Sequence, residues 1–336
     1  MRKVVSYLSC FIVFVFTLIG TKGYAQEETS VLFIGNSFTF YNYMPGILKE
    51  IAASNGKSMY VDTAVTGGKD LKFHSGRERT YSMIKSKKWD YIVLQGHSNE
   101  FAQPDGKVDT LTLPFAKKII DSIRVLSPCS RVLFYMTWGY KNGNPKWKAI
   151  AHYDSMQLRI ERQYLRFADL FSAGVAPVGM VWKEVRNDHP SITLYDADRF
   201  HPILTGSYLS ACTFYATIFG ETPYKNKAKV AIEPFQREVI ELAATKIVLN
   251  HLARWRYLPK SKPLVTGFDI VLKDKELQVI SNAKNHDVLE WDFGDGNRSK
   301  EVNPKHVFSN SGAYVIRQLV SSFCKNESLE RTINVD

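Results

Sequence analysis

Residues 31–39 read Val-Leu-Phe-Ile-Gly-Asn-Ser-Phe-Thr. The four apolar residues predict a strand buried on both faces, and the Gly35-Asn36 pair ends this strand in a turn. Ser37 therefore lies where the strand gives way to a helix, which we expect over 45–55. Such a turn exposes a hydroxyl beside unpaired backbone N–H groups, as a nucleophilic serine requires. The alternative role for Ser37 is that of a simple helix N-cap.

Short apolar runs alternate with longer helical patterns on either side of this turn. The expected strands are 31–35, 59–65, 91–95, 131–136 and 173–178. The expected helices are 45–55, 82–87, 114–126, 153–171 and 234–254, with a further apolar helix running through Phe219. This alternation predicts an α/β fold, a flavodoxin-like three-layer sandwich around a parallel sheet. Functional loops in such a sheet lie at the carboxyl ends of the strands.

A second reactive pattern lies far along the chain, at Asp198-Arg199-Phe200-His201. An aspartate three residues before a histidine can accept a hydrogen bond from Nδ1 while Nε2 faces the serine. We therefore predict Ser37 as nucleophile, His201 as base and Asp198 as the orienting acid. Asp196 is a spare acid with a less favourable spacing. No His/Cys/Asp cluster has the spacing of a metal site, so we predict no metal and no cofactor.

These blocks resemble the SGNH/GDSL hydrolases over about residues 30–225. Residues 35–39 are similar to the family's serine block, Gly67-Gly68 to its glycine block, and Asp198 with His201 to its Asp-x-x-His block. The resemblance implies the SGNH hydrolase fold and an ester hydrolase of class EC 3.1.1.

The third block departs from the family pattern. The family's Gly-x-Asn-Asp is replaced by Gln-Gly-His-Ser-Asn over 95–99, which is similar to the Gln-Gly-Glu-Ser-Asn of sialate O-acetylesterase-like carbohydrate esterases. The resemblance implies an oxyanion hole formed by the N–H groups of Ser37 and Gly68 and the side-chain amide of Gln95. Asn99 is the alternative to Gln95.

Three further residues are candidates for substrate binding, namely Asn36, His97 and Trp138. Trp138 follows the fourth strand, where its indole could stack on a sugar ring or pack against a neighbouring helix. His97 belongs to the oxyanion segment and could line the pocket.

The C-terminal region has a different character. After the linker 259–263, residues 264–336 consist of short β-type runs around Trp-Asp-Phe-Gly-Asp-Gly at 291–296. This string resembles a polycystic-kidney-disease (PKD) type immunoglobulin-like domain, a small all-β sandwich. We expect the module to act as a spacer or to dock on the catalytic domain, which we place at 28–258.

The N-terminus predicts export. Residues 1–25 combine Arg2 and Lys3 with an apolar run and small residues before a cleavage site near Ala25, typical of a signal peptide. The alternative is an uncleaved membrane anchor. Cleavage leaves no integral membrane domain and places the protein in the periplasm, on the cell surface or outside the cell. It also removes three positive and no negative charges, so the net charge falls from +11 to +8.

The remaining composition limits the partners. The basic charge is accompanied by no aromatic-rich Lys/Arg run, so we predict no nucleic-acid partner. The cysteines left after cleavage, Cys129, Cys212 and Cys324, have no paired spacing, and we expect small core or boundary residues rather than disulfides. The oligomeric state is not determined by the sequence.

The predicted function is removal of O-acetyl or other short acyl groups from a carbohydrate. The same residues could serve a lipase or thioesterase, and a third alternative is a non-catalytic glycan-binding protein. The sequence alone does not choose the acyl group or the sugar.

Overall fold

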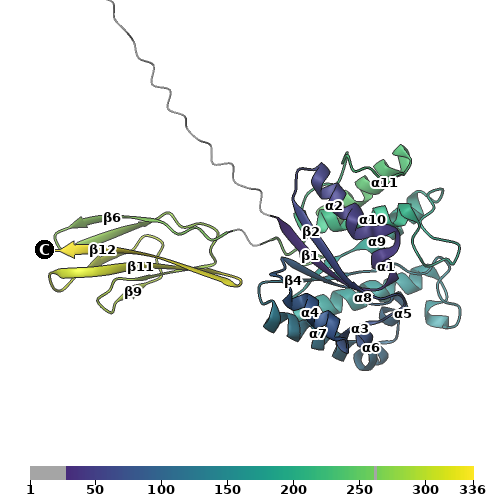
Figure 1. Ribbon diagram of the computed structural model, residues 1–336, viewed down its shortest axis with the longest axis horizontal. Coiled ribbons are helices and arrows are strands. Elements are labelled where there is room, and N and C mark those ends of the chain that lie inside the picture. Colours follow the sequence, from purple (N-terminus) through teal and green to yellow (C-terminus); the bar gives the residue numbers. More distant parts are fainter. Residues whose placement is uncertain (1–27, 261–262) are drawn as a thin grey trace, which may run out of the picture.

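The computed structural model describes residues 28–260 and 263–336, so the predicted signal peptide lies outside the described residues. Residues 28–260 form an α/β unit around one five-stranded parallel sheet, and residues 263–336 form a β-sandwich (Figure 1). Within these ranges no helix is long and apolar enough to cross a membrane.

The parallel sheet has the strand order β2-β1-β3-β4-β5. Its strands are β1 (Thr29–Gly35), β2 (Met59–Val65), β3 (Tyr91–Leu94), β4 (Arg131–Tyr135) and β5 (Gly174–Ala176). All five predicted strands are thus confirmed to within a few residues. The apolar runs predicted them because β1 and β3 to β5 are almost entirely buried between helices, and Tyr60 is the one exposed residue of the edge strand β2.

Two helical layers cover this sheet. The helices are α1 (Ser37–Phe40), α2 (Met44–Ser54), α3 (Leu71–Ser75), α4 (Glu78–Lys85), α5 (Ser98–Phe101), α6 (Asp105–Leu111), α7 (Leu113–Leu126), α8 (Tyr153–Phe171), α9 (Val178–Asp188), α10 (Leu204–Phe219) and α11 (Pro234–Ala244). Shorter turns are η1 (Tyr41–Tyr43), η2 (Lys148–Ile150) and the π-helical η3 (Thr245–Leu249). The helix predicted over 234–254 is therefore regular only as far as residue 244.

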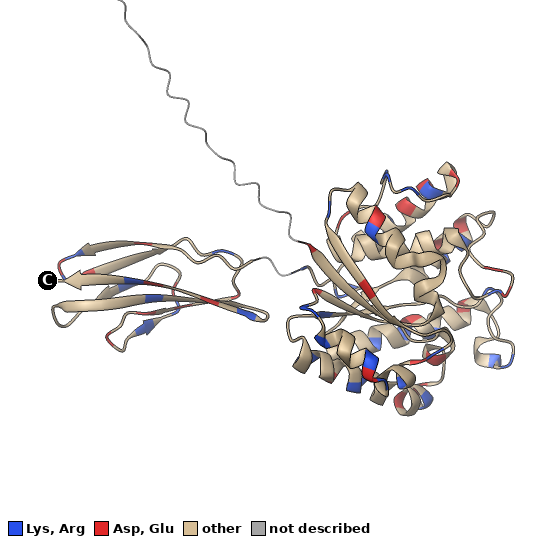
Figure 2. Cartoon of the chain, in the orientation of Figure 1, with Lys and Arg blue, Asp and Glu red and all other residues tan. Residues whose placement is uncertain are grey.

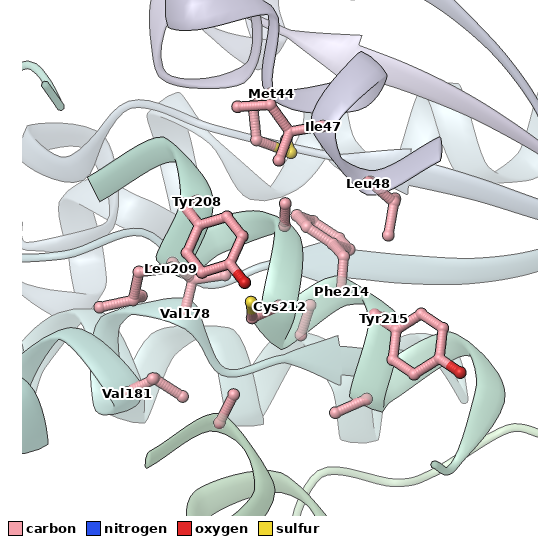
Figure 3. Packing of buried hydrophobic residues seen from close by; sticks show 14 of the residues in the cluster. Met44, Ile47, Leu48, Val178, Val181, Tyr208, Leu209, Cys212, Phe214 and Tyr215 are labelled. Carbon is pink, nitrogen blue, oxygen red and sulfur yellow. The ribbon is translucent and has the colours of Figure 1, made fainter. Parts of the chain in front are cut away.

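The two cores show why this is a three-layer sandwich. Successive residues of β1 point to opposite faces, so Val31 and Phe33 pack with α2, α9, α10 and α11, whereas Leu32 and Ile34 pack with α3, α4, α7 and α8. Figure 3 shows part of the first core, in which apolar side chains of α2, α9 and α10 surround the thiol of Cys212. Cys212 is fully buried, which confirms its prediction as a core residue.

The C-terminal sandwich consists of two antiparallel sheets. Their strand orders are β10-β7-β6 and β12-β11-β8-β9. The strands are β6 (Phe268–Lys273), β7 (Glu276–Ser281), β8 (Val288–Asp292), β9 (Arg298–Ser299), β10 (Lys305–Val307), β11 (Gly312–Ser322) and β12 (Lys325–Val335). The indole of Trp291 is fully buried in a separate core between the sheets.

A disulfide joins the two units, and the prediction for Cys129 and Cys324 is therefore wrong. Cys129 lies just before β4, and Cys324 lies in the turn of the β11–β12 hairpin, 195 residues further on, with 5.2 Å between the Cα atoms. The neighbouring Phe323 ring lies 4.5 Å from the Arg131 guanidinium. The hairpin thus contacts the amino-terminal end of the sheet, opposite the strand ends where Ser37 lies (Figure 1).

Charged residues of both signs alternate over the outer helices and the sandwich strands (Figure 2). The basic excess is therefore spread over a surface that also carries acids, as in an ordinary solvated surface.

Candidate active site

The serine turn is built from local hydrogen bonds. Asn36 is the N-cap of α1, and its Oδ1 accepts a hydrogen bond from the N–H of Phe38 at 3.2 Å. This cap starts the helix at Ser37, whose side chain is near the protein surface although the residue is only 8% exposed. A Cβ at Gly35 would lie 2.5 Å from Gln95 Oε1, so the turn has no room for a larger residue there.

The histidine loop places its imidazole against this serine. His201 Nε2 lies 2.8 Å from Ser37 Oγ, and His201 Nδ1 lies 2.5 Å from Asp198 Oδ2. Asp198 Oδ1 also accepts the N–H groups of Phe200 at 3.0 Å and His201 at 2.9 Å, which closes the turn around the carboxylate. Arg199 accommodates this turn by adopting a left-handed conformation with φ of 72°.

These contacts determine the protonation pattern of the relay. Partial burial raises the pKa of Asp198, but hydrogen bonds from Phe200 and His201 outweigh burial and hold the pKa below its usual value. The ionised carboxylate keeps the proton of His201 on Nδ1, which leaves Nε2 as an acceptor for the Ser37 hydroxyl. The structure thus brings together Ser37, His201 and Asp198 in the order that nucleophilic catalysis needs. Asp196 makes no contact with the imidazole, and its backbone N–H instead pairs with the His201 carbonyl.

The neighbouring N–H groups are suited to an oxyanion. Among the described residues, neither the N–H of Ser37 nor that of Gly68 has a hydrogen-bond partner. Gly68 has φ of +67°, a conformation that favours glycine and turns its peptide within the loop after β2. Both N–H groups are thus available to an oxyanion, and an oxyanion hole at Ser37 and Gly68 stays a prediction.

Gln95 does not fit the role predicted for it. Its side chain is fully buried, with Nε2 donating to Asn36 Oδ1 at 2.9 Å and to the Gly96 carbonyl at 2.7 Å. Its Oε1 accepts the N–H of Asn36 at 2.8 Å and the hydroxyl of Thr39 at 3.0 Å. Both amide protons are engaged, so Gln95 positions the serine turn instead of donating to an oxyanion. Asn99, whose Nδ2 has no partner among the described residues, remains the candidate third donor.

Two predicted substrate contacts also need correction. Asn36 is only 1% exposed, and its Nδ2 donates to the Lys69 carbonyl at 2.9 Å, so it joins two loops of the site. Trp138 is fully buried between the Phe38 ring at 4.9 Å and the Trp182 ring at 4.0 Å. Its indole N–H donates to the Phe200 carbonyl at 3.0 Å. Trp138 therefore packs beneath the site, and no sugar ring can reach its face.

His97 lies in the wall of the site. Burial and the nearby His201 lower the pKa of His97, although Asp70 opposes the change. Its Nδ1 accepts the N–H of Asn99 at 3.3 Å and, with the side chain of Glu100, caps α5. The lowered pKa favours the neutral imidazole. His97 lines a pocket together with Gly68 and Asn99, and its part in substrate binding stays a prediction.

Two residues of the site were not found from the sequence. The Tyr41 ring stacks on the His201 imidazole with 4.2 Å between centroids and an interplanar angle of 1°. Asn42 Nδ2 donates to the Pro202 carbonyl at 3.1 Å and to Ser207 Oγ at 2.9 Å. The only signal was their position directly after the serine turn. In the described part of the chain, no group of three His, Cys, Asp or Glu side chains could hold a metal ion.

Comparison with known proteins agrees with this two-part fold. Residues 274–335 match the PKD domain model. The C-terminal sandwich is a PKD domain. No curated protein matches the sequence.

Solved structures resemble the α/β unit. A DUF4886 family protein from Bacteroides uniformis is 21% identical with a TM-score of 0.59, and the match covers 66% of this chain and 95% of that one. A proposed SGNH hydrolase from Slackia heliotrinireducens is 25% identical with a TM-score of 0.44, over 56% of this chain and 98% of that one. An acetyl xylan esterase is 16% identical with a TM-score of 0.42, over 56% of this chain and all of the other. The structural neighbours of the α/β unit thus include SGNH hydrolases, but none of these three is described as a sialate O-acetylesterase.

Proposed function

We propose that this protein is an exported serine esterase that removes short acyl groups, foremost acetyl groups, from a carbohydrate. The observation that carries the proposal is the continuous hydrogen-bonded relay from Ser37 Oγ through His201 to Asp198. The unpaired N–H groups of Ser37 and Gly68 support the same chemistry, because acyl transfer passes through an oxyanion.

The reaction follows from this geometry in two steps. Ser37 Oγ attacks the ester carbonyl carbon while its proton passes to His201 Nε2, and the N–H groups of Ser37 and Gly68 bind the oxyanion. The tetrahedral intermediate then collapses, and the alcohol leaves with the proton from His201. In the second step His201 takes a proton from water, the hydroxyl attacks the acyl-enzyme, and the carboxylic acid leaves as Ser37 regains its proton.

The disulfide supports export. Disulfides persist in oxidising compartments such as the periplasm and the cell exterior, and they are rare in the cytosol. The Cys129–Cys324 bond, together with a PKD domain, is therefore consistent with the signal peptide predicted over residues 1–25.

The same bond bears on the role of the PKD domain. The module is attached twice, through residues 259–263 and through the hairpin turn at Cys324, at the end of the sheet opposite Ser37. We propose that it is a docked spacer, which leaves the active site open to a large substrate.

Ester hydrolysis tests the proposal directly. The purified protein should hydrolyse 4-nitrophenyl acetate faster than the butyrate and should release acetate from acetylated polysaccharides such as xylan or pectin. Ser37→Ala should lose at least ~1,000-fold in kcat, whereas Ser82→Ala, at an exposed serine of α4, should match the parent protein. Equal activity in Ser37→Ala and the parent would overturn the proposed function.

A further inference from the structure

A groove extends from the candidate oxyanion hole across the surface of the α/β unit. It has a volume of about 420 Å³. We call this site the Trp147 groove. Its lining includes Gly68, Asp70, Asn99, Gln103, Lys107 and Trp147. Gly68 belongs both to this groove and to the candidate oxyanion hole, so a substrate bound at Ser37 would extend into it.

The chemistry of the groove is mixed. Trp147 is 38% exposed and so presents part of its indole to solvent, unlike the fully buried Trp138. The lining also carries a carboxylate, two amides and the ammonium group of Lys107, whose Nζ lies 5.8 Å from the centre of the Trp147 ring. The exposed side chain of Leu111 belongs to the same lining, so the groove offers apolar as well as polar contacts. It suits a sugar ring, which has an apolar C–H face for an indole and hydroxyls for amides and charges.

Trp147 is held in a defined position. Asn144 Nδ2 donates to Asn99 Oδ1 at 3.2 Å, and the N–H of Trp147 donates to the Asn144 carbonyl at 3.2 Å. The same loop is fixed at Gly143, where a Cβ would lie 2.6 Å from the backbone of residues 151 and 152. The backbone of Trp147 is therefore connected through Asn144 to Asn99, the candidate third oxyanion donor. A binding surface that is already ordered loses little entropy when it binds a ligand.

We propose that the Trp147 groove binds the pyranose ring that carries the ester, with Trp147 as its stacking face. This inference rests on the proposed function and specifies it. The groove holds the alcohol part of the substrate, and the acyl group lies at Ser37. The side chains that would recognise the sugar line the Trp147 groove, and none of them belongs to the relay of Ser37, His201 and Asp198.

The experiment compares esters with and without a sugar. Kinetics are measured for the parent protein, Trp147→Ala, Trp147→Phe and the control Phe235→Ala, which removes an aromatic ring that is 59% exposed on α11. The substrates are 4-nitrophenyl acetate and the acetylated glycan, among xylan, pectin and chitin oligosaccharides, that the parent protein deacetylates fastest. Thermal unfolding verifies that each variant is folded.

We expect Trp147→Ala to raise KM for the acetylated glycan by ~10-fold, because the variant loses one stacking contact with the sugar. Its kcat should change little. Its kcat/KM for 4-nitrophenyl acetate, which carries no sugar, should fall by a much smaller factor than its kcat/KM for the glycan. Trp147→Phe should recover most of the KM, and Phe235→Ala, outside the groove, should leave both activities unchanged. Equal KM values in Trp147→Ala and the parent would overturn the sugar site while leaving the esterase intact. So would a parent protein that hydrolyses 4-nitrophenyl acetate but no acetylated glycan. A parent protein with no activity on any ester would instead refute the proposed function itself.

Discussion

Replacing Tyr41 by leucine tests how the protein holds His201, the proposed catalytic base. The Tyr41 ring lies parallel to the His201 imidazole at 4.2 Å, and the imidazole is largely enclosed, with its side chain 16% exposed. During catalysis this imidazole becomes a cation, and an aromatic face stabilises a cation by about 0.5–2 kcal/mol. The stack also limits rotation of the ring away from Ser37. Taking ~1 kcal/mol for the lost interaction, we expect Tyr41→Leu to lower kcat/KM about fivefold.

The assay is hydrolysis of 4-nitrophenyl acetate by Tyr41→Leu, Tyr41→Phe and Tyr43→Leu. Tyr41→Phe keeps the aromatic face and should stay within about twofold of the parent. Tyr43 belongs to the same turn but is 71% exposed and stacks on no histidine, so Tyr43→Leu controls for disturbance of the turn. The reasoning fails if Tyr41→Leu is as active as Tyr43→Leu, because the stack would then contribute nothing to the transition state.

Three further predictions concern positioning, pH and the disulfide. Gln95→Met should lower kcat, and it should lower the free energy of unfolding by about 1–3 kcal/mol, because it leaves buried donors of the serine turn unpaired. Urea unfolding measures this loss, and an unchanged free energy of unfolding would contradict the prediction. Burial raises the pKa of Glu100 from 4.5 to about 8. Between these pH values the carboxyl group is protonated in the folded state and ionised in the unfolded state, so the free energy of unfolding falls as pH rises. The stability of Glu100→Gln relative to the parent should therefore increase as pH rises from 4.5 to 8, by no more than ~5 kcal/mol, and should not increase further above pH 8. Thermal unfolding at several pH values measures this difference, and a difference that is the same at pH 4 and pH 8 would contradict the prediction. The double variant Cys129→Ser/Cys324→Ser should be cleaved faster by protease at residues 259–263. It should keep its esterase activity, because the disulfide lies at the opposite end of the sheet from Ser37. Unchanged cleavage would contradict the prediction and show that the module is docked without the disulfide.

Local patterns predicted the fold of this chain well. The strands of the parallel sheet were found because each is a short apolar run covered by helices, so its hydrophobicity is continuous and easily recognised. Part of the relay could be anticipated for a related reason: Asp198 and His201 are three residues apart, and their contact forms within one turn. The pairing of His201 with Ser37, 164 residues away, was implied by the resemblance to SGNH hydrolases.

Other features that depend on distant contacts could not be predicted. Cys129 and Cys324 are 195 residues apart, and no spacing rule pairs them. Trp138 follows a strand, where an exposed indole was possible, but Trp182 of α9 covers it. Gln95 has the right residue type for an oxyanion donor, yet its amide protons are taken by Asn36 and Gly96. In each case the partner that determines the role is contributed by tertiary packing.

Covalent trapping of the nucleophile tests the central claim most directly. The protein would be treated with a fluorophosphonate, which reacts with activated serines, and the adduct would be located by peptide mass spectrometry. The relay from Ser37 to His201 predicts one adduct on Ser37, with loss of esterase activity in proportion to labelling, no labelling of Ser37→Ala and much slower labelling of His201→Ala. An adduct on another serine, or an active esterase that the reagent does not label, would contradict the assignment of Ser37 as the nucleophile.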